Sequence, residues 1–215
     1  MNPFRIADVR AYSLSEPGVG GDYHDRAQGH WLVDSLISTP MSVYPEYKES
    51  RTSWGIAVLG SLVVEIETES GVVGVATGFG GDPACFLIEK HFRRFLMGAD
   101  VRDTARLFDQ MFRASMPYGR KGLTLAAISV VDLALWDAQG IVRGEPVYKL
   151  IGGETKDEIP LYCTGPRPDI ARELGFWGGK VPLPHGPGDG RDGLRANRDF
   201  LAGHRAKVGD EVPLM

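Results

Sequence analysis

Hydrophobic and polar positions alternate most clearly around residues 62–66, where Leu62, Val64 and Ile66 recur every second position. This two-residue period is typical of a strand with one buried face. The turn sequence Glu69-Ser70-Gly71 follows and leads into the apolar residues of a second strand, so the pattern predicts a β-hairpin. An earlier strand is predicted over residues 4–14. The sequence therefore indicates a small antiparallel sheet near the N-terminus.

Three helices are predicted after the hairpin. Asp82 and Pro83 have the N-cap and first-turn pattern of a helix that ends at Gly98. A second helix is predicted from about Asp103, and a third over residues 123–139, apolar on nearly all sides and therefore expected at a junction with other structure. The residues expected to face inward are Ile88, Phe92, Phe95, Leu96, Leu107, Phe108, Met111, Phe112, Ile128, Val131, Leu135 and Trp136.

Beyond Gly152-Gly153 short strands alternate with helices. Strands are predicted over residues 159–164 and 176–181 and from residue 212, and helices over 169–174 and 194–204. This alternation is typical of parallel β/α units. About two and a half units do not close a barrel, which takes about 250 residues in its complete eight-fold form. We predict two domains, residues 1–152 and residues 153–215, the second being an incomplete barrel.

Composition narrows the class of partner. The chain has 215 residues and a formal net charge of −4. Such a balance gives no reason to expect a nucleic-acid partner, which usually requires a basic face. We expect a small-molecule partner, no membrane partner and a cytoplasmic location, because we find neither a membrane-spanning apolar run nor a secretory signal. Cys85 and Cys163 are far apart, and we expect two buried thiols rather than a zinc site or disulfide framework.

A long polar and glycine-rich stretch extends to Arg51 and contains two candidate binding residues. Loops of this length in compact domains are usually functional or disordered. The run 20–25, which reads GGDYHD, places His24, two carboxylates and a phenol beside glycines, and such a loop can present hydrogen-bond donors to an anionic or polyhydroxylated ligand. A solvated polar loop and a metal site are the alternatives. The guanidinium of Arg51 suits a bidentate grip on a carboxylate. Its alternative role is a surface charge that balances Glu46 or Glu49.

Other polar residues give weaker indications. Lys180 is predicted near the carboxyl end of the second barrel strand, where residues of barrels face the reaction centre. Its alternative role is that of a strand-end lysine whose hydrogen bonds are satisfied within the fold. The histidines His30, His91, His185 and His204 have no partners at an informative spacing, and we assign no catalytic role to them.

The loop GGDYHD, the segment HWLVDSLISTPMSVYPEYKESR, the helix stretch ISVVDLALWDAQG and the run GEPVYKLIGG together resemble the enolase superfamily, in its mandelate racemase/muconate lactonizing type. The similarity covers essentially the whole chain. VDLALWDAQG and PVYKLIGG are shared across the superfamily, whereas GGDYHD and YKESR indicate an acid-sugar dehydratase branch.

This resemblance implies an α+β capping domain followed by the start of an incomplete (β/α)7β TIM-type barrel. It implies that His24 and Arg51 contact a sugar-acid substrate, and that Mg²⁺ stabilises the enediolate formed when a base removes the proton α to the carboxylate. Such a proton is weakly acidic, so its removal needs charge stabilisation in a preorganised site. The family also implies a homo-oligomer for the complete protein.

Two departures from the family pattern bear on activity. Many members carry Lys-x-Lys on the second barrel strand, whereas this chain reads Lys180-Val181-Pro182. The resemblance then implies a histidine base with a supporting aspartate from later strands. The Mg²⁺ ligands are expected downstream of Met215, so we expect this chain alone to be inactive. Two alternatives remain: another acid-sugar dehydratase or racemase of the superfamily, and a non-catalytic ligand-binding or assembly module.

Overall fold

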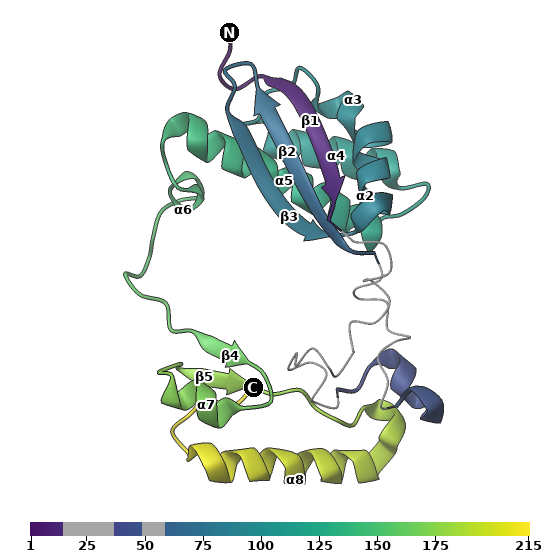
Figure 1. Ribbon diagram of the computed structural model, residues 1–215, viewed down its shortest axis with the longest axis vertical. Coiled ribbons are helices and arrows are strands. Elements are labelled where there is room, and N and C mark those ends of the chain that lie inside the picture. Colours follow the sequence, from purple (N-terminus) through teal and green to yellow (C-terminus); the bar gives the residue numbers. More distant parts are fainter. Residues whose placement is uncertain (15–36, 49–58) are drawn as a thin grey trace. The chain divides into compact units, whose positions relative to one another are not determined.

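The computed structural model describes residues 1–14, 37–48 and 59–215 (Figure 1). Contacts divide them into two compact units, the first formed by 1–14 and 59–155, the second by 37–48 and 156–215. This grouping differs from a division at residue 152 alone, because the segment 37–48 packs with the second unit.

A three-stranded antiparallel sheet forms the first layer of the first unit. Its strands are β1 (Ile6–Ser13), β2 (Ser61–Thr68) and β3 (Val73–Phe79), in the order β1-β2-β3. The hairpin between β2 and β3 is confirmed. The alternation in β2 buries Leu62 and Ile66 completely, as its two-residue period predicts.

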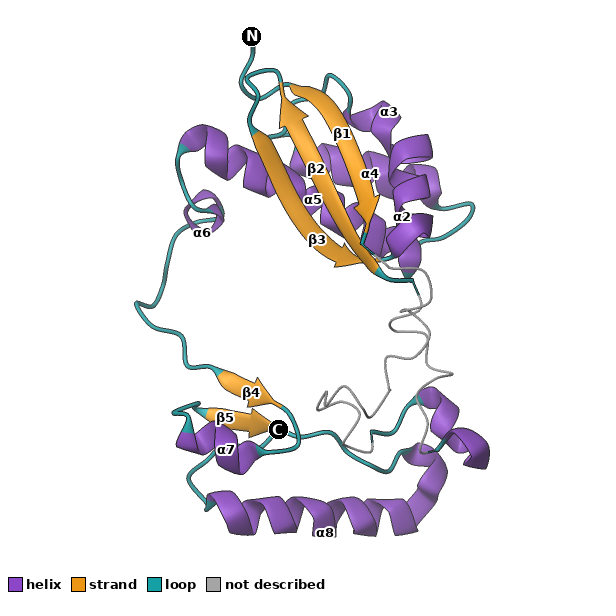
Figure 2. Ribbon diagram, viewed as in Figure 1, coloured by secondary structure: helices purple, strands orange, loops and turns teal. Residues whose placement is uncertain are grey.

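Helices cover one face of this sheet (Figure 2). They are α2 (Gly81–Leu87), the π-helical turn η4 (Ile88–Phe92), α3 (Arg93–Leu96), α4 (Thr104–Ser115) and α5 (Leu123–Arg143); the short α6 (Val147–Leu150) follows α5 and contacts it rather than the sheet. The first three follow one another without a break, which confirms the first predicted helix. Its start differs from the prediction, because the cap is Gly80 rather than Asp82. Gly80 and Gly81 both have positive φ and turn the chain directly from β3 into the helix.

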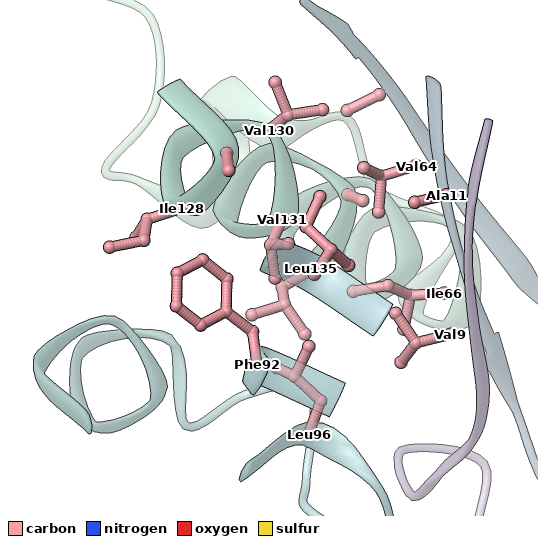
Figure 3. Close-up of a cluster of buried hydrophobic side chains, with 14 of the residues drawn as sticks. Val9, Ala11, Val64, Ile66, Phe92, Leu96, Ile128, Val130, Val131 and Leu135 are labelled. Atoms are coloured by element: carbon pink, nitrogen blue, oxygen red, sulfur yellow. The ribbon is translucent and has the colours of Figure 1, made fainter. Parts of the chain in front are cut away.

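The core of the first unit lies between the sheet and these helices (Figure 3). Phe92, Leu96, Leu135 and Ile66 are completely buried in it. Each such side chain contributes roughly 1.5–3 kcal/mol by leaving water. The inward positions predicted for the three helices are buried or half-buried here, so the helical period located this core correctly.

Helix α5 lies closely against β3. Gly74, Ala76 and Gly78 alternate along the strand on the side that faces the helix. A Cβ atom at Gly74 would overlap the backbone of Ala134 and Ala138, so only glycine fits there. The small residues of β3 therefore set the distance between sheet and helix.

Charged side chains occupy both edges of the sheet. On β1 the guanidinium of Arg93 donates hydrogen bonds to the carbonyl oxygen of Val9 and to the carboxylate of Asp8, which also accepts from the Val9 amide. On β3 the amide of Val75 donates to Asp137 of α5 at 2.8 Å. Backbone groups that point away from the sheet thus find partners on side chains.

Helix α5 runs four residues further than predicted and ends at Gly144, which has a left-handed conformation suited to glycine. Among the described helices it is long and apolar enough to cross a bilayer, by length and composition. Half of that apolar window is buried inside the unit, which is the pattern of a core helix.

The second unit contains a parallel pair of strands, β4 (Tyr162–Thr164) and β5 (Gly178–Lys180), with α7 (Pro168–Glu173) between them in the chain. Helix α8 (Gly190–Val208) follows, and residues 213–215 then bond to β5 in parallel through Gly179 and Leu214. The predicted order of strands and helices is confirmed, although the strands are shorter and α8 is longer than predicted. The segment 37–48 adds two 3-10 turns, η2 (Pro40–Val43) and η3 (Pro45–Tyr47).

The two cysteines are free thiols, but they are only half-buried, so the expectation of buried thiols is wrong. Burial by neighbouring atoms nevertheless raises the pKa of Cys85, and Asp82 and Glu89 act in the same direction.

Candidate functional site

The carboxyl ends of the parallel strands align along one edge of the second unit. Thr164 pairs with Lys180 across β4 and β5, and Lys180 is followed by Val181, whose amide donates to the carbonyl of Met215 at 2.9 Å. Ligand sites of parallel sheets and barrels lie beyond such ends, where the loops begin. This edge and the loop after β5 therefore form the candidate site.

Glycines on β5 allow this alignment. A Cβ at Gly178 would lie 2.8 Å from the carbonyl oxygen of Pro213, and one at Gly179 would lie 2.6 Å from Cβ of Pro168 in α7. Both distances are shorter than real Cβ contacts. The glycine pair therefore permits β5 to approach the third strand and the helix closely.

The loop after β5 runs from Val181 to Asp189 and ends in the 3-10 turn η5 (Pro187–Asp189). The side chain of Asn197 in α8 holds it in place: its oxygen accepts from the amide of His185 at 3.1 Å, and its nitrogen donates to the carbonyl of His185 at 2.8 Å. This two-bond contact fixes the loop on the helix that follows it.

The segment 37–48 packs on this loop. The amide of Ser38 donates to the carbonyl of Leu183 at 3.0 Å, and Lys48 Nζ lies 2.5 Å from Asp189 Oδ1. A cavity of about 550 Å³ lies between them, lined by residues 37–40, 42, 43, 183 and 185–189. The cavity combines apolar walls with a few polar groups, which is typical of ligand pockets.

Asp189 is the most strongly bonded charge in this region. Its carboxylate accepts from Lys48 and from the amide of Gly186, which lowers its pKa, the Lys48 contact having the larger effect. His185 Nδ1 lies 3.6 Å from the other oxygen of the same carboxylate and has no hydrogen-bond partner among the described residues. The cluster therefore holds an ionised aspartate between a lysine and an imidazole.

The predicted site residues fall in two groups. Lys180 is the last residue of β5 and is exposed at the aligned strand ends, as predicted. His24, with the run 20–25, and Arg51 lie outside the described residues, as does His30. The structure therefore tests the position of Lys180 and leaves the two substrate-binding predictions as predictions.

Two further histidines have structural surroundings. His91 hydrogen-bonds the hydroxyl of Tyr118 at 2.5 Å on the first unit. His204 is buried on α8 against the ring of Phe200, and this burial lowers its pKa.

Among the described residues no three His, Cys, Asp or Glu side chains gather in a way that could hold a metal ion. The described residues therefore do not provide a Mg²⁺ site by themselves.

Sequence reasoning missed the contacts of Lys48 and Asn197. Lys48 and Asp189 are 141 positions apart, and their pairing has no local spacing from which it could be predicted. The sequence places residues 182–190 only between a predicted strand and a predicted helix. The glycines of this loop gave the one available signal, because Gly186 and Gly188 lie where the segment 37–48 approaches the loop.

Comparison with known families gives one match over much of the chain. The mandelate racemase / muconate lactonizing enzyme N-terminal domain matches residues 44–152, slightly more than half of the sequence.

Individual relatives match the whole chain. A protein of Caldivirga maquilingensis, provisionally named L-rhamnonate dehydratase, is 53% identical over all 215 residues. The crystal structure of rhamnonate dehydratase from Gibberella zeae complexed with Mg is 60% identical, with a TM-score of 0.90 over 100% of this chain and 53% of that one. Another crystal structure of L-rhamnonate dehydratase from Gibberella zeae is 56% identical, with a TM-score of 0.88, and this chain covers 52% of it. The chain spans about half the length of the relatives it matches.

Proposed function

Because this chain belongs to the mandelate racemase / muconate lactonizing enzyme family of the enolase superfamily, we propose that it forms the capping domain and first barrel units of an L-rhamnonate dehydratase. The observation that carries the proposal is the 53–60% identity, over the entire chain, to proteins bearing that name. The reaction removes water from L-rhamnonate and gives 2-keto-3-deoxy-L-rhamnonate.

The second unit is the beginning of the (β/α)7β barrel in this proposal. Its parallel strands, with their carboxyl ends aligned at Lys180, support that assignment. The position two residues after Lys180 is Pro182, so β5 carries no second lysine that could remove the α-proton. The base and the Mg²⁺ ligands then belong to later strands, outside this sequence, and Mg²⁺ would supply the positive charge that stabilises the enediolate.

The capping domain contributes substrate contacts. We assign the bidentate grip of a carboxylate or polyol to Arg51, since its guanidinium presents paired donors, and a hydrogen bond to the sugar acid to His24. Both contacts select the substrate rather than move its proton. Their removal should therefore raise KM more than it lowers kcat.

Turnover by a chain that spans the full length of the relatives tests the reaction. With L-rhamnonate and Mg²⁺, formation of a 2-keto acid is expected, measured by its semicarbazone absorbance. The 215-residue chain under the same conditions is expected to form none. If the longer chain dehydrates another sugar acid of a panel but not L-rhamnonate, the substrate assignment is wrong and the reaction class still holds.

Substitution at Arg51 tests the contact. Arg51→Ala should raise KM for the sugar acid by about 100-fold, in the range of a lost charged hydrogen-bonded pair. Arg51→Lys is the matched control, because it keeps the charge and loses the paired donors. Unchanged KM in Arg51→Ala would contradict the assignment.

Calorimetry of the 215-residue chain with L-rhamnonate addresses a binding module as the alternative. If the 215-residue chain binds L-rhamnonate tightly and a chain that spans the full length of the relatives does not turn it over, a non-catalytic binding module is favoured over the dehydratase.

A further inference from the structure

One ion pair joins the segment 37–48 to the loop that follows β5. Lys48 Nζ and Asp189 Oδ1 lie 2.5 Å apart, and the two side chains are 37% and 18% exposed. The pair is therefore partly shielded from water, where a charge interaction is stronger than on an open surface. It connects two residues that are 141 positions apart in the sequence.

The loop side of this pair is held by hydrogen bonds that do not involve Lys48. Asp189 also accepts from the amide of Gly186 at 3.0 Å. The backbone of His185, one residue before Gly186, exchanges two hydrogen bonds with the side chain of Asn197. The carboxylate consequently has a defined position. A lysine that binds it loses its own freedom without requiring the loop to reorganise.

The segment 37–48 has order of its own. The hydroxyl of Thr39 accepts from the amide of Met41 at 3.2 Å, and the hydroxyl of Ser42 accepts from the amide of Thr39 at 2.9 Å. This is a capping box, here at the start of η2. The ring of Tyr44 packs edge to face on that of Tyr47 in the following turn. A contact made at one end of this segment therefore constrains the rest of it.

Glycines let the two parts approach closely. A Cβ at Gly188 would lie 3.0 Å from Cγ1 of Val43, and a Cβ at Gly186 would meet the side chain of Ser38. The segment is thus in van der Waals contact with the loop at two points in addition to its hydrogen bond and ion pair.

We propose that Lys48 and Asp189 are positioning residues for substrate binding. In this role the ion pair holds the segment 37–48 on the loop after β5, and it sets where the chain leaves that segment, three residues before Arg51 in the sequence. Neither residue is assigned a contact with the substrate. The inference rests on the proposed function, in which Arg51 binds the sugar acid.

A disulfide tests whether the segment is seated as described. The Cβ of Val43 lies 3.7 Å from an ideal Cβ on Gly188, close to the separation found in disulfides, about 3.8 Å. In a chain with Cys85 and Cys163 replaced by serine, Val43→Cys/Gly188→Cys should oxidise completely in air. Val43→Cys/Gly203→Cys is the control, with its second cysteine on the open side of α8. If both cysteine pairs oxidise equally, or if neither oxidises, residues 37–48 do not pack on the loop after β5 as described.

Kinetics of a chain that spans the full length of the relatives test the positioning role. Lys48→Met and Asp189→Asn should each raise KM for the sugar acid about tenfold and change kcat less than threefold. The double variant should be no worse than either single one, because both remove the same pair. Lys48→Arg should stay close to the wild type, and Lys156→Met, which removes an exposed charge elsewhere, should leave KM unchanged.

Rescue separates positioning from a merely structural role. Adding the Val43–Gly188 disulfide to Lys48→Met should return KM to within threefold of the wild type, because the covalent link replaces the ion pair. An unchanged KM in Lys48→Met, or a KM that the disulfide fails to restore, would overturn the proposal. If the wild type converts a different sugar acid, the substrate assignment fails alone, and the same comparison is made with that acid.

Discussion

Replacing Gly74 by alanine should strongly destabilise the first unit. The new methyl group would overlap the carbonyl oxygen of Ala134 and the backbone nitrogen of Ala138 in α5. These are backbone atoms in the middle of a helix of 21 residues, so they have no rotamer with which to move aside. The overlap is relieved only if β3 and α5 separate.

The size of the effect follows from that separation. Ordinary contact between the methyl carbon and backbone atoms needs about 3.5 Å, so the two elements must part by about 1 Å. A gap of that size forfeits about a quarter to a half of the dispersion energy of each atom pair along the contact. Overpacking of well-packed cores costs ~1–3 kcal/mol and occasionally more. We expect the upper end, about 3 kcal/mol.

Native-state hydrogen exchange measures this loss within the first unit. Amides of β2 should exchange roughly 100-fold faster in Gly74→Ala, since about 1.4 kcal/mol corresponds to a factor of ten. Gly203→Ala is the control for the same chemical change. Apart from the nearby backbone of α8 itself, the new methyl group at residue 203 has no atom within 4 Å. Alanine inside a helix is ~0.5–1 kcal/mol more stable than glycine, so the amides of α8 should exchange more slowly in this variant. A change below about 1 kcal/mol in Gly74→Ala would refute the packing argument.

Three further predictions concern buried groups. Leu135→Ala should cost the first unit about 2–5 kcal/mol by leaving a cavity, measured by urea unfolding. Gln139→Ala should cost about 1–3 kcal/mol, because its side-chain nitrogen donates at 2.8 Å to the carbonyl of Val101, which would be left buried without that partner; hydrogen exchange around Val101 reports the loss. Burial lowers the pKa of His204, so its imidazole binds a proton less readily in the folded second unit than in the unfolded chain. The stability that the second unit gains from a neutral His204 is complete above about pH 6.5. It falls as the pH drops below that value, by at most about 1.4 kcal/mol per pH unit. Melting temperatures between pH 7.5 and 5 should show this slope, and His204→Phe should remove it.

Sequence patterns predicted the order of elements well, because burial imposes a period on each of them. The alternation in β2 and the helical repeat through Phe92 and Leu96 arise from one-sided contact with the same core. Ends were less predictable. Asp82 is a residue type that often caps a helix. The chain already turns at Gly80 and Gly81, however, and the helix begins at Gly81.

The candidate site was predictable only in part. Lys180 was placed correctly, because the alternation of strands and helices locates strand ends. The packing of residues 37–48 on the loop after β5 could not be predicted in this way. Polar 3-10 turns show no hydrophobic period, and Lys48 pairs with a residue from a distant part of the chain. Contacts of this kind depend on tertiary structure, so the cavity beside His185 could not be anticipated either.

The charged side chains at the sheet edges have a consequence for self-association. Arg93 on one side and Asp137 on the other bond to the main-chain atoms of Val9 and Val75 that an incoming strand would need. A strand from a second chain that docked at either edge would have to displace the charged side chain there, which would lose its hydrogen bond to the main chain. The register also shifts between Ile6 and Asp8, which breaks the regular edge of β1. Copies of this protein that associate through the first unit should therefore meet through side-chain surfaces, and the sheet should resist growth into fibrils.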